Sequence, residues 1–281
     1  MKPRRLQVRA QISLNAIIQI ISLPDSESGP AIRLSEDLEI LCCGNDYLYR
    51  CYKIYSKFEF MRSMFEIIDV CYRLSCHPIL HFDMHGSAIN GLKLSGTGEY
   101  VTWTELRDWL RTINSKTQCN LMCIFAVCHA FKMILNVEIT KLTPYFILIA
   151  PRGKIRNSDL EKRMAPFYAS AIQSRSVNES YNIFLMEKFE IFHAEKMMME
   201  SIAKYFRQSC MGRGKQERIE GLLSEFKTRN PPGTEIDLAV VRQFIRSRIK
   251  PAQWVIDRYR ETFLQGRSCS LDIEDVLSLL R

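Results

Sequence analysis

The chain has 281 residues, enough for one large domain or for a domain with an appendage, and at this length it needs no disulfide framework to bury a core. Apolar residues make up 47% of it and charged residues 25%, which excludes collagen-like, low-complexity and disordered proteins. The net charge of +8 comes from scattered basic residues, so it favours an acidic partner without defining a nucleic-acid surface.

Basic residues at positions 2, 4, 5 and 9 precede the apolar run Ala16–Leu23, an order that resembles the beginning of a signal peptide. The run is interrupted by Gln19 and Ser22, and no cleavage-site pattern follows it. It is also far shorter than the ~20 residues needed to cross a bilayer. We therefore expect a basic tail before a core strand, with no membrane span.

Ten cysteines are spaced irregularly, and most of them lie inside apolar runs. This usage indicates reduced thiols of a cytoplasmic protein rather than a disulfide scaffold. Chemistry needs only one reactive thiol, so we expect the others to be small core residues.

The first two-thirds of the chain alternate between short β-branched runs and helical spacing. Strands that alternate with helices predict a mainly parallel sheet sandwiched by helices, with ligands beyond the carboxyl ends of the strands. The predicted elements in chain order are strand 17–23, a turn-rich loop at 24–30, helix 34–43 with Ser35 as N-cap, strand 47–54, helix 58–74, strand 78–82, a hairpin over 91–103, helix 104–113 capped by Thr102 or Thr104, strand 121–127 with a short helix after it to about residue 135, strand 145–150 and helix 158–172.

From about Phe189 onward the strand signal disappears. Helical spacing predicts helices over 192–206, 217–226, 238–249, 254–263 and 273–280, with a proline-rich break at 230–233. We therefore divide the chain into an α/β domain over 1–188 and an all-helical C-terminal domain over 189–281. The densest basic cluster, at positions 242, 246, 248 and 250, indicates the solvated face of an amphipathic helix.

Reactive side chains follow two of the predicted buried strands. His85 and Gly86 come shortly after strand 78–82, and Cys128 follows strand 121–127 at the start of a short helix. Parallel strands end at one edge of a sheet, so both segments should meet there. A thiol is mostly protonated at neutral pH, and a histidine beside a cysteine supplies the base that it needs. The N–H groups of Gly86 and Cys128 are natural donors to the oxygen of a carbonyl under attack.

The segments 78–87, 91–94, 101–106, 120–128 and 144–151 together resemble the caspase-like cysteine peptidases, and most closely the bacterial members called CHAT-type. The shared pattern is a His-Gly pair after one core strand, then a hairpin and a helix, and a cysteine after the next core strand. The resemblance covers roughly residues 15–172. The caspase histidine precedes the cysteine by ~50 residues, and here His85 precedes Cys128 by 43.

This resemblance implies a caspase-like fold and the hydrolysis of peptide bonds in a protein substrate. By the match, Cys128 is the nucleophile, His85 activates it or protonates the leaving amine, and the N–H groups of Gly86 and Cys128 form the oxyanion hole. A thioester acyl-enzyme follows, which water hydrolyses, with no metal and no cofactor. Bacterial relatives often cut a pore-forming or regulatory partner in anti-phage defence, so the resemblance implies such a substrate and an activator protein as partners.

The sequence departs from the caspase pattern beside the cysteine. Caspases have Gln-Ala-Cys-x-Gly, whereas this chain has Ala126-Val-Cys-His-Ala130, so strict specificity for aspartate is in doubt. His129 either perturbs the neighbouring Cys128 or is a bystander, and we favour the bystander because adjacent residues on a strand or tight turn face apart. The spacing of Cys119, Cys123, Cys128 and His129 fits no usual zinc pattern, and no metal is expected.

Two further residues are candidates for the substrate site. Asp83 lies two residues before His85 and therefore on the same face of a strand, where it orients the histidine, lines the substrate pocket or serves as a hydrogen-bonded structural carboxylate. His81 shares that face and is expected in the core. Arg152 follows strand 145–150 and either lines the pocket or is a solvated loop arginine.

Two other functions stay open beside the peptidase. One is a catalytically silent caspase-like scaffold or binding module, and the other is a nucleic-acid-associated regulator that uses the basic helices. The intact pair of Cys128 and His85 favours the peptidase, because a decayed site usually loses one of the two residues.

Overall fold

The computed structural model of the protein describes residues 12–230, 237–269 and 271–280. The basic N-terminal residues and most of the proline-rich break at 230–233 lie outside this range. Among the described residues, no helix is both long and apolar enough to cross a membrane.

The core of the molecule is a sheet in which all but one strand of the main path are parallel. It carries helices on both faces, and the predicted fold class, a mainly parallel sheet sandwiched by helices with a helical extension, is confirmed. The strand order is β2-β1-β3-β6-β7-β8, with the bounds β1 Ala16–Ser22, β2 Leu48–Lys53, β3 Pro78–Ser87, β6 Met122–Ala126, β7 Ile147–Ala150 and β8 Glu190–His193.

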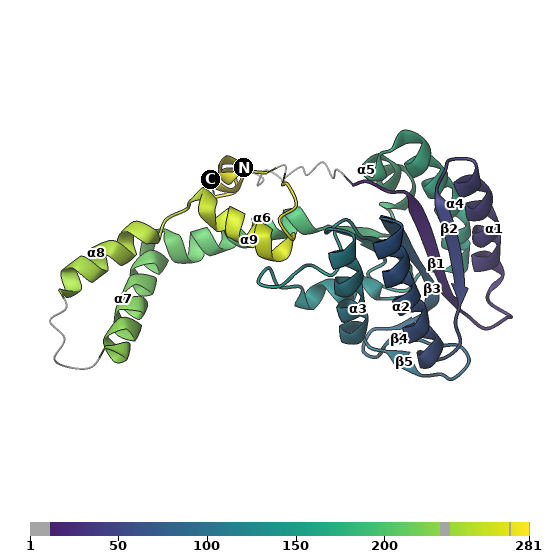
Figure 1. Ribbon diagram of the computed structural model, residues 1–281, viewed down its shortest axis with the longest axis horizontal. Coiled ribbons are helices and arrows are strands. Elements are labelled where there is room, and N and C mark those ends of the chain that lie inside the picture. The colour runs from purple at the N-terminus through teal and green to yellow at the C-terminus, as the bar shows by residue number, and fades with distance from the viewer. Residues whose placement is uncertain (1–11, 231–236, 270, 281) are drawn as a thin grey trace.

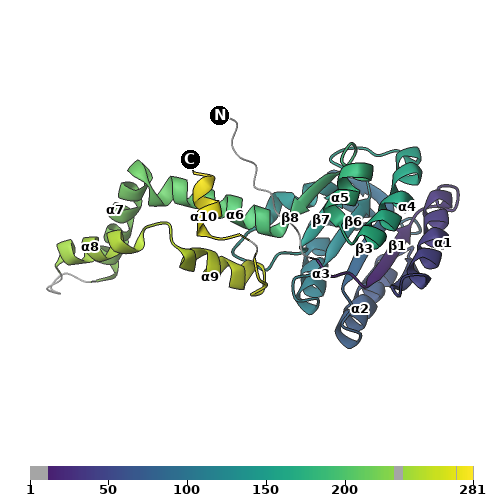
Figure 2. The ribbon, with the colours of Figure 1, turned by 90° about the horizontal axis from the view of Figure 1, so that it is seen from above.

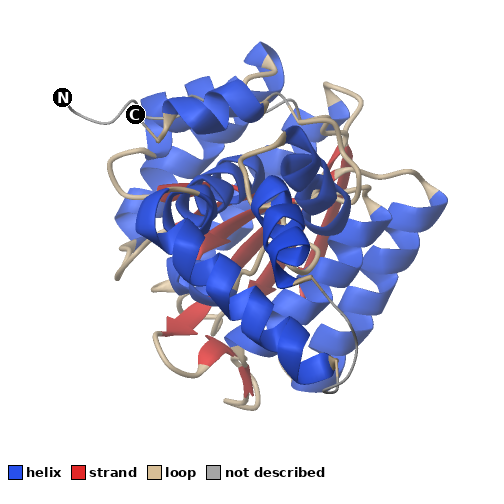
Figure 3. Cartoon of the chain, turned by 90° about the vertical axis from the view of Figure 1, so that its left-hand side faces the viewer, coloured by secondary structure: helices blue, strands red, loops and turns tan. Residues whose placement is uncertain are grey.

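The central strands are largely apolar because helices cover both of their faces, with Gln19 of β1 and Asp83 of β3 among the buried polar exceptions. Every residue of β1, β6 and β7 is buried. Helices α1 (Gly29–Cys43) and α4 (Asn157–Ser174) pack side by side on one face, and α2 (Lys57–Arg73) and α3 (Trp103–Lys116) pack on the other (Figures 1 and 3). Fully burying one leucine or isoleucine of these faces contributes roughly 1.5–3 kcal/mol.

Capping side chains fix where the helices of the second face begin. Ser56 accepts from the backbone N–H of Glu59 at the start of α2, and Thr102 does the same for Glu105 at the start of α3. In both, the glutamate reaches back to the cap and completes a capping box. Thr102 is one of the two caps that the sequence predicts.

Helix α1 begins five residues earlier than predicted, at Gly29 rather than at residue 34. The prediction of Ser35 as N-cap is therefore wrong, and Ser28 takes that place. Pro30 lies in the first helical turn rather than in the predicted loop. The N–H groups of that turn have no acceptor within the helix, so a proline there loses no helical hydrogen bond. The early start carries the first turn of α1 toward the end of β3.

Strand β3 is longer than the apolar run that predicts it. It continues through His85 and Gly86 to Ser87, because its last three residues pair with β4 (Gly91–Lys93) of the predicted hairpin, whose other strand is β5 (Tyr100–Val101). The reactive segment is thus held in a strand rather than in a free loop.

The segment after β6 differs from the predicted helix start at Cys128. The helical turns there are of the 3₁₀ type and begin at Ala130 (η1, Ala130–Asn136). His129, which precedes them, has a left-handed backbone with φ 63°. Cys128 therefore lies in a tight turn between strand and helix.

Strand β8 is absent from the sequence prediction, which begins a helix at 192. Its four residues pair antiparallel with β7 alone, and half of them are polar, so neither apolar length nor alternation marks them. The sheet thus extends past residue 188, while the division of the chain at 188/189 stays a prediction.

From Ala194 onward the described residues form helices that lead away from the sheet (Figure 2). Arg267 joins this part to the sheet: it stacks on Phe146, with its guanidinium carbon 3.9 Å from the ring centroid, and donates to the carbonyl of Cys119 at 2.8 Å. The bounds are α5 Val177–Ser180 and η2 Tyr181–Leu185 before β8, then α6 Ala194–Tyr205, η3 Phe206–Cys210, α7 Gly212–Arg229, α8 Leu238–Arg248, α9 Gln253–Phe263 and α10 Ile273–Ser278.

Candidate active site

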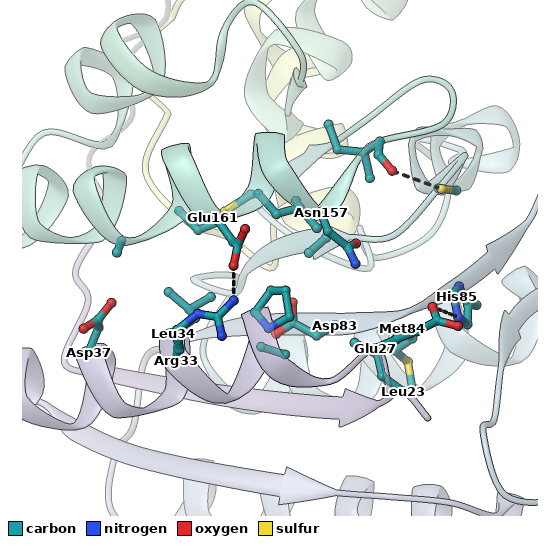
Figure 4. A pocket seen from close by; sticks show the side chains of 18 residues that line it. Leu23, Glu27, Arg33, Leu34, Asp37, Asp83, Met84, His85, Asn157 and Glu161 are labelled. Carbon is teal, nitrogen blue, oxygen red and sulfur yellow. Dashed lines mark hydrogen bonds and ion pairs between the residues drawn. The ribbon is translucent and has the colours of Figure 1, made fainter. Parts of the chain in front are cut away.

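A cavity of about 380 Å³ opens between α1 and α4, at the carboxyl ends of β3 and β6 (Figure 4). The two strands are parallel neighbours, and Asp83 pairs with Ala126 in their register. His85 and Cys128 lie two residues beyond that pair and both line the cavity. The structure thus confirms the expectation that the residues after Phe82 and Val127 share one edge of the sheet.

His85 stands at the mouth of the cavity with 47% of its side chain exposed. Its Nε2 atom lies 2.9 Å from Oε2 of Glu27 (Figure 4). Glu27 belongs to the turn after β1, which is closed by the hydrogen bond from its own N–H to the carbonyl of Pro24. The carboxylate fixes one nitrogen of the imidazole and leaves Nδ1 for other partners.

Gly86 lies directly against the backbone of the cysteine. A Cβ atom at this position would lie 2.2 Å from the carbonyl oxygen of Cys128 and 2.4 Å from Cγ1 of Val127, so only glycine fits. The N–H of Cys128 donates to no acceptor among the described residues, whereas the next N–H, of His129, is bound to the carbonyl of Gly153 at 2.9 Å. One of the two predicted oxyanion donors is therefore unoccupied.

The thiol of Cys128 is partly exposed, and its Sγ atom lies 3.9 Å from the carbonyl oxygen of Ile155. No hydrogen bond joins it to His85 in the part of the chain that the structure describes. The pair shares one cavity, but the thiol is turned toward the loop before α4. His129 does not line this cavity.

Most of the other thiols are unreactive because they are buried. It raises the pKa of Cys42 to about 11 and that of Cys119 to about 12, and the pKa of Cys123 lies well above its usual value for the same reason. These thiols stay protonated and pack as small apolar groups. No cluster of three or more histidine, cysteine or carboxylate side chains suited to a metal ion occurs within the described ranges.

Asp83 is a buried carboxylate that accepts a hydrogen bond from one neutral side chain and lies beside a buried histidine. Its Oδ2 accepts from Nε2 of Gln19 at 2.7 Å and lies 3.1 Å from Nε2 of His81. His81 is fully buried, as expected, and its Nδ1 lies 2.8 Å from the hydroxyl of Tyr168. Asp83 also lines the cavity, and no hydrogen bond joins it to His85 among the described residues, so its part in substrate binding stays a prediction.

Arg152 is not brought to this site. Its side chain is 72% exposed, pairs with Glu190 of β8 at 2.9 Å and lies over the ring of Phe131. It does not line the cavity, which corresponds to the solvated-arginine alternative.

The sequence analysis missed Glu27 and Gln19. Glu27 is one of several polar residues in a turn-rich loop, and Gln19 interrupts an apolar strand. A buried glutamine in a β-branched run is a signal for a hydrogen-bonded network, because an unpaired amide would be costly there. The loop glutamate carries no comparable signal.

No protein-family model matches the chain, and no curated protein matches it. Among solved structures, the chain is similar to the crystal structure of the Drosophila initiator caspase Dronc, with a TM-score of 0.45 and 12% sequence identity. The match covers 69% of this chain and 89% of that one. A likeness at this level concerns the backbone alone, so the chemistry of the site depends on its own residues.

Proposed function

We propose that the chain is a caspase-like cysteine endopeptidase in which Cys128 is the nucleophile and His85 the general acid and base. One observation carries the proposal: the two side chains line a single cavity at the carboxyl ends of neighbouring parallel strands. The close packing of Gly86 on Cys128 and the unoccupied N–H of Cys128 support it.

In this mechanism His85 takes the thiol proton of Cys128, and Sγ attacks the carbonyl carbon of a peptide bond. The oxygen gains negative charge and accepts hydrogen bonds from the N–H groups of Cys128 and Gly86. His85 protonates the departing amine, which leaves a thioester on Cys128. Water then attacks the thioester, His85 takes a proton from it, and the free thiol returns, so that one water is consumed for each peptide bond.

The described conformation is a resting arrangement in this scheme. Sγ lies 3.9 Å from the carbonyl oxygen of Ile155, and the mechanism requires a rotation about the Cα–Cβ bond of Cys128 that brings Sγ toward His85. Glu27 is a positioning residue, since it holds the imidazole through Nε2 and leaves Nδ1 for the thiol.

The rival function is a catalytically silent scaffold. It is favoured by the same resting geometry, because no hydrogen bond joins thiol and imidazole among the described residues, and Glu27 already occupies one nitrogen of His85. A silent protein would leave Cys128 with the reactivity of an ordinary thiol.

Alkylation by iodoacetamide near neutral pH separates the two, with exposed Cys43 and Cys51 as internal references. We expect Cys128 to react about ten times faster than these thiols, because an imidazole that takes up its proton raises the thiolate fraction. His85→Ala should remove the excess, and His129→Ala should not. Equal rates at all three thiols, with no effect of His85→Ala, would establish the silent scaffold.

We further propose that the peptidase acts in bacterial anti-phage defence. Its substrate is then a pore-forming or regulatory protein, and an activator protein is its second partner. Products of neighbouring genes, incubated one by one with the protein, test this setting. The expected result is a fragment that forms with the natural chain and is absent with Cys128→Ala and with His85→Ala. A fragment that still forms with either variant contradicts the catalytic assignment.

A further inference from the structure

The cavity beside the reactive pair is strongly acidic. Four carboxylates line it, from Glu27, Asp37, Asp83 and Glu161, against the single guanidinium of Arg33. The chain as a whole carries a net charge of +8, so this local excess of negative charge is opposite in sign to the rest of the protein. A low-dielectric pocket lined by negative charge attracts a positively charged group of a ligand.

Asp83 gives this charge a fixed position inside the cavity. Only 7% of its side chain is exposed, and both of its polar contacts involve Oδ2. Oδ1 accepts no hydrogen bond from any described residue, although the side chain lines the cavity. A buried carboxylate with one oxygen open to a cavity lacks a donor, and a ligand cation would supply it.

The hydrogen bond that holds Asp83 in place comes from a neutral side chain. Gln19 is neutral and is fixed by the hydroxyl of Tyr49 at 2.7 Å and by its own bond to the carbonyl of Ala31 at 3.1 Å. Nδ1 of His81 lies 2.8 Å from the hydroxyl of Tyr168, and its Nε2 lies 3.1 Å from Oδ2 of Asp83 without a hydrogen bond to any described residue. The donor that Asp83 does have, the amide of Gln19, is neutral, so a cationic ligand would bring both a charge and a further donor.

The spacing between Asp83 and the reactive pair suits a long side chain. Asp83 lies two residues before His85 on β3 and pairs with Ala126, two residues before Cys128, so the carboxylate lies about 6.6 Å deeper than the level of the reactive groups. The walls between are apolar and include Leu34 and Met164. A flexible methylene stem with a charged head fits such a channel.

We propose that this cavity recognises the side chain of a lysine or arginine on the acyl side of the scissile bond, the P1 residue. The proposal rests on the proposed peptidase function, because a P1 residue exists only where Cys128 cleaves. The methylene stem lies along the apolar walls, and the cationic head donates to Oδ1 of Asp83. An aspartate at P1 is repelled, and an apolar P1 residue leaves Oδ1 without a donor.

Arg33 and Glu161 lie at the other end of the cavity, on the side of Asp83 away from His85 (Figure 4). Their ion pair links α1 to α4 across the cavity (Figure 4). Both side chains are more than a third exposed, so the pair is screened by solvent and opposes an incoming cation only weakly. When Glu161 is released, its carboxylate can join Asp83 in binding the ligand.

Peptidyl acyloxymethyl ketones that differ only in the P1 residue test the proposal through the rate at which they label Cys128, followed by mass spectrometry. We expect probes with lysine or arginine to label at least about 100-fold faster than those with aspartate or leucine. Asp83→Asn should lower the rate for the basic probes at least about tenfold and leave the leucine probe unchanged. Glu36→Gln, which removes an exposed carboxylate of α1 outside the cavity, is the matched control and should change each rate less than about threefold.

These outcomes separate this inference from the peptidase proposal. If the aspartate or leucine probe labels Cys128 as fast as the basic ones, the pocket assignment is overturned while the peptidase stands, and this comparison needs no variant. If no probe labels Cys128, the peptidase fails. Binding of acetyl-lysine amide and acetyl-norleucine amide to Cys128→Ala, measured by NMR, then decides on the pocket: tighter binding of the lysine compound upholds cation recognition, and equal binding rejects it.

Discussion

Gly86 and Cys128 are in backbone contact: the hydrogen of the glycine occupies a place where a Cβ atom would lie 2.2 Å from the carbonyl oxygen of the cysteine. The obstacle is backbone rather than a flexible side chain, so it cannot be relieved by a rotamer change. The strand ends that carry the proposed nucleophile and base can therefore approach this closely only because residue 86 has no Cβ atom.

Gly86→Ala should separate these strand ends. We expect at least about a 100-fold loss of peptidase activity, because a displacement near 1 Å at a reacting group has an effect of this size. Unfolding in urea should show a loss of roughly 1–3 kcal/mol, as for other overpacked sites. The control is Gly221→Ala in helix α7, where an added Cβ meets no atom within 4 Å and alanine should stabilise by about 1 kcal/mol. An active and fully stable Gly86→Ala protein would contradict the proposed geometry.

Glu27 lies 2.9 Å from His85, and it should act on catalysis through that ring. Glu27→Gln keeps the shape but loses the charge that stabilises an imidazolium, so kcat should fall about 10- to 100-fold with KM nearly unchanged. Steady-state cleavage of a peptide substrate measures both constants. A partial recovery in Glu27→Asp would support positioning, whereas a change in KM alone would assign Glu27 to substrate binding instead.

The buried network around Gln19 should be a large contributor to stability. Gln19→Leu conserves volume but leaves Oδ2 of Asp83, the hydroxyl of Tyr49 and the carbonyl of Ala31 each with one hydrogen bond fewer. Because one of these groups is a buried carboxylate, we expect a loss of roughly 2–4 kcal/mol in the free energy of unfolding. Tyr49→Phe removes the bonds of the hydroxyl with Gln19 and Ser35 but leaves Asp83 its bond from Gln19, so it should lose only about 1 kcal/mol. If urea titration shows the two variants to be equally stable, the network does not hold Asp83 in place.

The reactive segments were predictable because their signals are local. The apolar runs before His85 and Cys128 mark buried strands, and a parallel sheet brings their ends to one edge. The partners of these residues were not predictable, because they depend on strand order: Gln19 reaches Asp83 only because β1 lies between β2 and β3.

Other differences between the predicted and the observed structure arise where the local sequence pattern is weak or where tertiary contacts outweigh it. Pro30 indicates a loop as readily as a first helical turn, so the start of α1 was placed too late. The four residues of β8 are too few to show a period, and their place at the sheet edge is set by contact with β7. Arg152 follows a strand end as the reactive residues do, but its ion pair with Glu190 holds it elsewhere.

His193, at the end of β8, should make the protein sensitive to acid. Burial, with the nearby charges of Arg267 and Lys196, lowers its pKa to about 4, and neither ring nitrogen has a hydrogen-bond partner among the described residues. The unfolded chain, with an ordinary histidine pKa near 6.5, binds a proton between about pH 6.5 and 4, whereas the folded protein does not. The free energy of unfolding therefore falls as the pH falls through this window, by at most roughly 3 kcal/mol from this residue.

His193→Phe should remove this part of the pH dependence. Phenylalanine keeps the edge-on ring contact with Phe146 and brings no proton-binding group, so at pH 7 the stability should stay within about 1 kcal/mol of the natural protein. Urea titrations at several values between pH 7 and 4.5 should give a shallower decline for the variant. His129→Asn is the control, since asparagine tolerates the left-handed backbone at that position, and it should decline as the natural protein does. Parallel curves for His193→Phe and the natural protein would show that other groups cause the acid sensitivity.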